Sequence, residues 1–223
     1  MSQQLVLDLY LPQPPSVEGY VAGENAEPLF MLGEWASGES YASFMYLWGG
    51  PSVGKSHLLA AARQRVPGAI LVDCARQALP LTIAPDAALL VDNVEHLDFE
   101  AQIRLFDHFN TLREGNGRLI ATGPVPPMQL ELRTDLTTRL GWGLVYQLKP
   151  LSDADKLAAL RKQAREWGFD LSTEAAEYLL RHTDRDLVSL QSVLTQANRY
   201  ALSQKRPVTV PLLREVLHAD RDF

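Results

Sequence analysis

One octapeptide in the first quarter of the chain limits the available folds more than any other segment. It reads Gly49-Gly50-Pro51-Ser52-Val53-Gly54-Lys55-Ser56 and fits G-x-x-x-x-G-K-[ST] completely. Residues 44–48 before it predict a buried strand, and residues 55–65 after it predict a helix. In that setting the backbone N–H groups can point at phosphates, Lys55 reaches the β- and γ-phosphates, and Ser56 ligates Mg²⁺. We therefore expect bound ADP or ATP with Mg²⁺ rather than a plain glycine turn.

Four further apolar runs predict the other strands of a parallel sheet. They are residues 69–72, 87–92, 118–122 and 144–148, each flanked by turn residues. Between the second and third runs, Ile103, Phe106, Phe109 and Leu112 recur every third residue and predict a helix with one apolar face. Another helix is expected to reach Arg139. Five strands with intervening helices predict an α/β domain in three layers, which we assign to residues 17–148.

The pattern becomes helical after Lys149-Pro150. Ser152 to Asp155 resembles a helix N-terminal cap, and Leu157, Leu160 and Ala164 continue a helical period. Further helices are expected from Ser172 or Thr173, from about Asp184, and over residues 211–218. This region, residues 149–223, predicts a small all-helical domain. At the other end, Pro and Gly recur over residues 12–28 and set residues 1–16 apart as a tail.

Composition excludes several classes of protein. The 223 residues include 21 Lys+Arg and 27 Asp+Glu, which gives a net charge of −6 and argues against a general nucleic-acid binder. The single cysteine, Cys74, allows no internal disulfide and favours a reducing compartment. No signal peptide is recognisable, and the uncharged stretch 40–54 is shorter than the roughly 18 apolar residues of a membrane helix. We expect a cytoplasmic protein without membrane contact.

The order of these motifs resembles that of AAA+ P-loop NTPases with a helical lid, and more narrowly the nucleotide-binding module of the DnaA family. Residues 20–25, Tyr20-Val21-Ala22-Gly23-Glu24-Asn25, resemble the aromatic-x-x-G-x-N segment at the adenine end of the nucleotide. Residues 138–144, Thr138-Arg139-Leu140-Gly141-Trp142-Gly143-Leu144, resemble the S-R-F-G-W-G-L stretch that carries an arginine finger. The resemblance spans about residues 17–219. It implies nucleotide contacts from Tyr20, Val21 and residues 50–57, which are Gly50, Pro51, Ser52, Val53, Gly54, Lys55, Ser56 and His57. It also implies a catalytic role for Arg139, whose alternative role is a helix-end arginine in a surface ion pair.

The tail resembles a second known element. Gln4-Leu5-Val6-Leu7-Asp8-Leu9 is similar to the Q-L-x-L-x-L peptide that docks on the DNA polymerase sliding clamp, with contacts from Gln4, Leu5, Leu7 and Leu9. Alternating leucines would equally suit an edge strand. A short clamp peptide before a DnaA-like module is, however, the layout of the Hda family of DnaA regulators. DnaA continues into a helix-turn-helix, whereas this chain ends at Phe223, so we expect no strong direct nucleic-acid binding.

Three positions depart from the pattern of hydrolysing relatives. Residues 89–92 resemble a Walker B strand, with Asp92 in the magnesium shell, although a capping aspartate would look the same. Asn93 follows where hydrolysing AAA+ enzymes carry an acid, and an amide cannot accept the proton of the attacking water. Glu95 and His96 are expected to be surface residues of the next turn. Pro124 lies near the position called sensor 1, which usually carries an acid in the family. Val188 lies near the position called sensor 2, which carries an arginine, and Arg185 lies one turn before it.

The combined expectation is a negative regulator of replication initiation with weak or no ATPase activity of its own. Its partners would be DnaA and the sliding clamp, and Arg139 would act on ATP held by DnaA. A homo-oligomer is compatible with this layout. The first alternative is a self-hydrolysing AAA+ helicase loader or remodeller, which the intact Gly54-Lys55-Ser56 permits and Asn93 disfavours. The second is an adaptor that recruits DnaA without stimulating hydrolysis.

Overall fold

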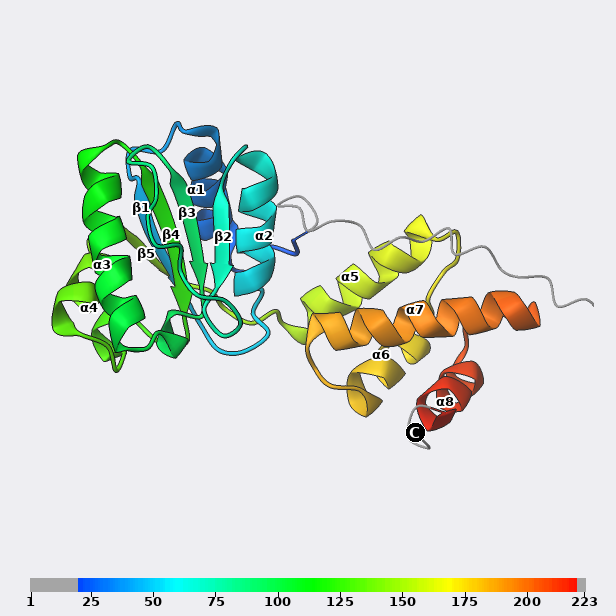
Figure 1. Cartoon of the computed structure of the whole chain (residues 1–223). Coiled ribbons are helices and arrows are strands. Elements are labelled where there is room, and N and C mark those ends of the chain that lie inside the picture. Colours follow the sequence, from blue (N-terminus) through cyan, green and yellow to red (C-terminus); the bar gives the residue numbers. More distant parts are fainter. Residues whose placement is uncertain (1–19, 220–223) are drawn as a thin grey trace, which may run out of the picture. The chain divides into compact units, whose positions relative to one another are not determined.

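The computed structural model describes residues 20–219, and the chain divides between Pro150 and Leu151 into two compact units (Figure 1). In the first unit, five parallel strands form one sheet in the order β2-β3-β4-β1-β5. The strands are β1 (Phe44–Trp48), β2 (Ile70–Asp73), β3 (Ala88–Asp92), β4 (Arg118–Gly123) and β5 (Leu144–Gln147). The predicted parallel sheet is therefore confirmed. The carboxyl ends of parallel strands meet at one edge, so the loops after β1, β3 and β4 converge there.

Helices cover both faces of the sheet, which makes the predicted three layers (Figure 1). On one face, α1 (Ala26–Ser37) and α2 (Lys55–Arg65) pack against Met45 and Leu47 of β1. On the other, α3 (Phe99–Glu114) and α4 (Thr134–Leu140) pack against Tyr46. Side chains alternate between the two faces along β1, as the pleat of a strand requires. Two short 3₁₀ helices, η1 (Val94–His96) and η2 (Pro127–Gln129), follow β3 and β4.

Helix α1 is missing from the elements that the sequence predicts. The density of Pro and Gly over residues 12–28 points to a broken backbone there, yet Pro28 is the third residue of α1. The first turn of a helix leaves its N–H groups without intrahelical partners, so proline is tolerated in that turn. The helix ends at Gly38, whose φ of 82° is a left-handed conformation suited to glycine.

The second unit contains four helices among its described residues. They are α5 (Asp153–Glu166), α6 (Thr173–His182), α7 (Leu187–Gln204) and α8 (Val210–Ala219), and they enclose their own apolar core, which includes Leu160, Leu179, Leu194 and Leu212. The predicted cap at Ser152 is confirmed as a capping box with Asp155. The third helix begins later than the expected Asp184, because the Asp186 side chain accepts from Ser189 N at 2.9 Å and caps it.

Candidate functional site

The loop after β1 has the backbone conformation that a phosphate cradle needs. Gly54 has a φ of 97° and Ser52 a φ of 58°, so the chain curls through the left-handed region twice before α2 begins at Lys55. Gly54 offers no side-chain cap to α2. The N–H groups of the first helical turn therefore remain available to an anion, and the helix dipole favours negative charge there. This cradle fits the diphosphate of ADP or ATP.

Lys55 folds back over the same loop. Its Nζ donates to the carbonyl oxygens of Gly49 at 2.7 Å and Gly50 at 2.8 Å. Burial lowers the pKa of Lys55, and the negative charges of Glu95 and Asp92 partly offset this effect. The ammonium group is thus bonded to the loop, and it senses the negative charges of Asp92 at the end of β3 and of Glu95 in η1. A bound phosphate would replace two neutral carbonyl acceptors with a charged one, which forms the stronger hydrogen bond.

Tyr20 covers the loop from the N-terminal side. Its hydroxyl donates to the carbonyl oxygen of Val53 at 2.7 Å, and its ring centroid lies 5.9 Å from that of His57. A Cβ at Gly54 would come within 2.4 Å of the Tyr20 ring, so only glycine permits this contact. Burial raises the pKa of Tyr20 to about 12. Tyr20 and the loop are thus brought together, and Val21 follows Tyr20 at the same border.

A buried asparagine, which the sequence-based site assignment omits, joins the segment after Tyr20 to the end of the first unit. Asn25, only 1% exposed, donates from Nδ2 to the carbonyl oxygen of Lys149 at 2.9 Å and accepts from Lys149 N at 2.7 Å. Its side chain is occupied in this way, which explains why Asn25 precedes α1 without capping it. Its place in the aromatic-x-x-G-x-N segment is the signal that could have found it.

Asp92 lies at the carboxyl edge with a partner from β4. It is 4% exposed, and its Oδ1 accepts from the hydroxyl of buried Thr122. The Thr122 hydroxyl oxygen in turn accepts from Asn93 N at 3.2 Å. Asp92 and exposed Ser56 are the residues that would hold Mg²⁺, and a hard cation suits their oxygen donors. No cluster of three or more His, Cys, Asp or Glu suited to a metal occurs within residues 20–219.

Two polar residues that follow Asp92, Asn93 and Glu95, have different surroundings. Asn93 bonds to Asp73 of the neighbouring strand β2. Glu95 is exposed, as expected, and its charge acts on Lys55, Tyr46 and Cys74 together. The sequence did not indicate that Glu95 would affect the pKa of these three residues. The position of one carboxylate in the sequence does not reveal which ionisable groups lie near it in the fold.

Arg139 lies in the last turn of α4, away from the phosphate loop's helix and on the opposite face of the sheet. It is half-buried, with its guanidinium 4.2 Å from the centre of the Phe106 ring and Nε donating to Asn110 Oδ1 at 3.2 Å. Trp142, three residues further along the chain, is 61% exposed, and the Arg113 guanidinium lies 5.2 Å from the centre of its ring. Among residues 20–219, these contacts of Arg139 are with an aromatic ring and an amide rather than with a carboxylate.

The two sensor regions differ in their surroundings. Pro124 is exposed after β4, where Gly123 packs tightly against Tyr46. Val188, 74% exposed, lies in the first turn of α7, and Arg185 is exposed just before it. Neither Pro124 nor Val188 has a side chain that could bind a phosphate.

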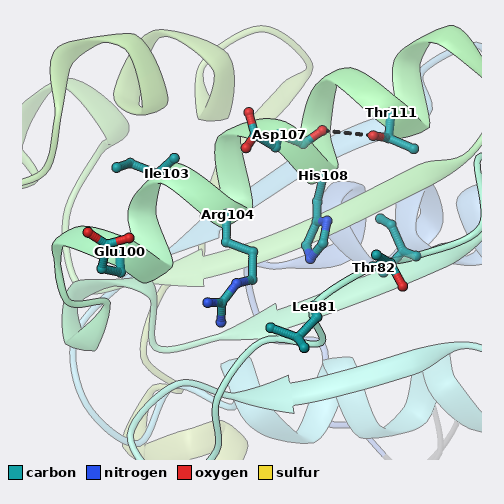
Figure 2. A pocket seen from close by; sticks show the side chains of 9 residues that line it. Leu81, Thr82, Glu100, Ile103, Arg104, Asp107, His108 and Thr111 are labelled. Carbon is teal, nitrogen blue, oxygen red and sulfur yellow. Dashed lines mark hydrogen bonds between the residues drawn. The ribbon is translucent and has the colours of Figure 1, made fainter.

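A separate hollow lies between α3 and the connection from β2 to β3 (Figure 2). Its volume is about 340 Å³, and Leu81, Arg104 and His108 are among its lining residues. Buried His108 contacts the carbonyl oxygen of Pro80 at 2.8 Å through Nε2, and Arg104 donates to that of Leu79 at 3.3 Å. These bonds hold the irregular connection between β2 and β3 against α3. None of the expected site residues lines the hollow.

Two expectations concern features outside this site. The clamp-peptide residues Gln4, Leu5, Leu7 and Leu9 lie outside the described residues 20–219. Across those residues, none of the helices has the length and apolar character needed to cross a bilayer.

Both units of the chain match known proteins. Residues 153–217 match the family model described as the Hda lid domain. Domain III of the replication initiation protein DnaA from Thermotoga maritima matches with a TM-score of 0.75 at 20% identity, covering 92% of this chain and 95% of that one. AMPPCP-bound DnaA from Aquifex aeolicus matches with a TM-score of 0.72 at 21% identity, over 86% of this chain and 67% of that one. At such identities these two likenesses show the fold alone.

Two further comparisons complete the findings. This chain spans 66% of the length of a DnaA structure bound to AMPPCP and single-stranded DNA. The protein NMB1076 from Neisseria meningitidis is 39% identical over 49% of this chain and 77% of that one, and its TM-score is 0.43. The predicted AAA+ fold with a C-terminal lid is confirmed. The chain thus carries the lid domain of the Hda family at residues 153–217, together with an AAA+ fold like that of DnaA domain III.

Proposed function

We propose that this protein is a negative regulator of replication initiation that stimulates ATP hydrolysis by DnaA. It holds ADP or ATP at the loop 49–56, docks on the sliding clamp through residues 4–9, and presents Arg139 to ATP bound by DnaA. The observation that carries the proposal is that the phosphate loop and the Arg139 side chain lie in different places on the α/β unit. A phosphate cradle without an acid at position 93 lies at the strand ends, and a guanidinium supported by Phe106 and Asn110 lies on the α3–α4 face.

The phosphate loop would hold the nucleotide by its backbone. N–H groups of residues 50–56 and the Lys55 ammonium neutralise the phosphates, while Tyr20 and Val21 border the adenosine end. Ser56 and Asp92 would hold Mg²⁺, which supplies charge neutralisation between the phosphates when bound. DnaA of the same fold binds AMPPCP. Because Asn93 cannot accept a proton, the bound nucleotide acts mainly as a brace for the α/β unit.

Arg139 would act across an interface. A guanidinium brought to the γ-phosphate neutralises the charge that develops as the phosphoryl group leaves, which is worth about 10³ to 10⁵ in rate in other systems. The ring of Phe106 and the Asn110 amide fix the arginine in one direction, so less conformational entropy is lost when it meets the phosphate. The clamp peptide would raise the local concentration of the regulator near replicated DNA.

The decisive experiment measures ATP hydrolysis by DnaA in the presence of clamp-loaded DNA. Arg139→Ala should remove the stimulation, while ADP binding and clamp binding persist. Exposed Arg63→Ala on α2 is the matched control and should stimulate normally. Undiminished stimulation by the Arg139 variant refutes the role of this arginine, whereas DnaA binding by the wild-type protein without any stimulation would favour the adaptor.

Two further measurements test clamp docking and the protein's own ATPase activity. Leu7→Ala with Leu9→Ala should abolish clamp pull-down, whereas Val6→Ala with Asp8→Ala, on the alternate positions, should not. Retained clamp binding by the first variant contradicts the docking role. An ATPase assay on the protein alone, with and without DNA, should show little turnover; robust turnover would favour the self-hydrolysing loader or remodeller.

A further inference from the structure

Strand β5 (Leu144–Gln147) leaves one edge of the sheet open. It is the last strand in the order β2-β3-β4-β1-β5, and among the described residues 20–219 no strand pairs with its other side. Leu148 N donates to Trp48 O at 2.7 Å, so the even-numbered residues turn their backbone groups toward β1. Val145 and Gln147, both exposed, therefore point their N–H and C=O groups outward. Such a row of groups is a template for a further strand.

Aromatic side chains border this edge on the face that α1 covers. Tyr146 packs on that face, and its hydroxyl donates to Glu27 Oε1 of α1 at 3.2 Å. Phe30, one turn further along α1, is 66% exposed, and Tyr41 is 83% exposed. Burial, the bond and charge of Glu27, and the charge of Tyr41 all raise the pKa of Tyr146, which places Tyr41 near it. The border of the open edge is thus largely apolar and exposed.

The described part of the chain begins close to this edge. Asn25 bonds to the backbone of Lys149, two residues after β5, so the N-terminal segment enters at the carboxyl end of that strand. Residues 10–19 separate the segment 4–9 from the first described residue. At roughly 3.3–3.6 Å per residue, ten extended residues span about 33–36 Å. Four residues of β5 extend only about 13 Å, so the segment 4–9 can reach the whole edge.

The segment 4–9 has the pattern of a strand with one apolar face. Leu5, Leu7 and Leu9 alternate with Val6 and Asp8. In an extended backbone the three leucines lie on one side, where they match the aromatic border of the open edge. The Asp8 carboxylate then lies on the other side, away from the acidic residues of α1. An extended peptide that adds to an exposed sheet edge in this way gains both main-chain hydrogen bonds and apolar contacts.

We propose that residues 4–9 pair with the open edge of β5 when the sliding clamp is absent, so that this edge and the clamp compete for one peptide. The inference rests on the proposed docking of these residues on the clamp. The leucines that would fill the clamp pocket are the ones that would cover Phe30 and Tyr41, and they cannot do both. Pairing therefore lowers the apparent clamp affinity in proportion to the fraction of free peptide. Clamp docking, in turn, uncovers the β5 edge.

The first experiment measures amide hydrogen exchange at Val145 and Gln147 in the full chain without clamp. Their outward N–H groups should exchange at least about threefold more slowly in wild type than in Val6→Pro with Leu7→Pro. One of two adjacent residues must donate to the partner strand, so the double proline prevents pairing. Ser2→Pro, outside the segment, is the matched control and should keep the slow exchange. Equally fast exchange in wild type and in the double proline variant would overturn the proposal.

The second experiment measures clamp affinity by surface plasmon resonance in variants of the edge that leave the peptide intact. Tyr41→Asp and Val145→Asp should each bind the clamp at least about threefold more tightly than wild type, because more peptide is free. Leu81→Asp, at an 81% exposed position between β2 and β3, is the matched control and should bind like wild type. Unchanged affinity in both edge variants would overturn the competition. The exposure of Tyr41 means that its variant keeps the fold even if Val145→Asp does not.

The remaining outcomes separate this inference from the proposed function. If wild type binds the clamp while Val145 and Gln147 exchange as fast as in the proline variant, clamp docking stands and the inference alone is overturned. If wild type does not bind the clamp, the docking function fails, and the exchange rates still decide the pairing. Slow exchange that is lost on dilution would assign the edge to a second copy of the chain and overturn pairing within one chain. Circular dichroism melting confirms that each variant is folded.

Discussion

The phosphate-loop edge and the α3–α4 face are built by different means. At the edge, the arrangement depends on the backbone: positive φ angles, a helix N-terminus without a side-chain cap, and a tyrosine packed where only glycine fits. On the α3–α4 face the arrangement depends on side chains, with Arg139 over Phe106 and bonded to Asn110. The sheet lies between the two helical layers. A nucleotide held at the edge would therefore not touch the arginine, and substitutions can change either region separately.

The largest difference between the two regions is expected in the ADP-induced melting shift of Lys55→Ala. Saturating ADP at 100 times its Kd would stabilise wild type by about 2.7 kcal/mol, or a melting shift of roughly 5–10 °C for a chain of this size. Without the Lys55 ammonium this shift should vanish, while Arg139→Ala should retain it in full. Scanning calorimetry with and without ADP provides the measurement. A full shift in Lys55→Ala would mean that the loop does not hold the phosphates.

The contrast between the regions also explains what the sequence can predict. The loop 49–56 specifies its conformation locally, so motif and strand-helix setting are enough to place it. Arg139 can be named only through a resemblance, because its support comes from Phe106 and Asn110, about 30 residues away on another helix. The bond from Asn93 to Asp73 depends on strand order, which no local pattern encodes. Helix α1 escapes prediction because the position of Pro28 within a helical turn decides its effect.

The next effect concerns the link between Tyr20's segment and the end of the first unit. Asn25→Ala removes two bonds to the Lys149 backbone, and should cost roughly 2–3 kcal/mol because it leaves these groups unpaired. Glu24→Ala is the matched control, since its ion pair with Lys149 Nζ is exposed and should cost under about 1 kcal/mol. Urea denaturation monitored by fluorescence measures both. Equal losses in the two variants would contradict a special role for Asn25.

A smaller effect is expected on the α3–α4 face. Asn110→Ala removes one partly exposed hydrogen bond to Arg139 and should cost about 1 kcal/mol of stability or less. Stimulation of DnaA should fall, though less than in Arg139→Ala, because the stacking on Phe106 remains. ADP binding should be unchanged. Asn110→Asp keeps an oxygen acceptor for Arg139 and serves as the control; if it loses as much stimulation as Asn110→Ala, the hydrogen bond is not what orients the arginine.

The smallest effect is expected in the reactivity of Cys74, which should respond to charge at the phosphate-loop edge and not to changes on the α3–α4 face. Burial raises the pKa of the Cys74 thiol to about 12, with further contributions from the charges of Asp73, Asp92 and Glu95. Since the thiolate is the reactive form, Cys74 should react with a disulfide reagent at pH 8 about 10³-fold more slowly than a free cysteine. Mg²⁺ added without nucleotide should accelerate the reaction a few-fold, because a cation near Asp92 offsets those charges and lowers the thiol pKa. Arg139→Ala should leave the rate unchanged, and a native thiol as reactive as the unfolded one would contradict the burial of Cys74.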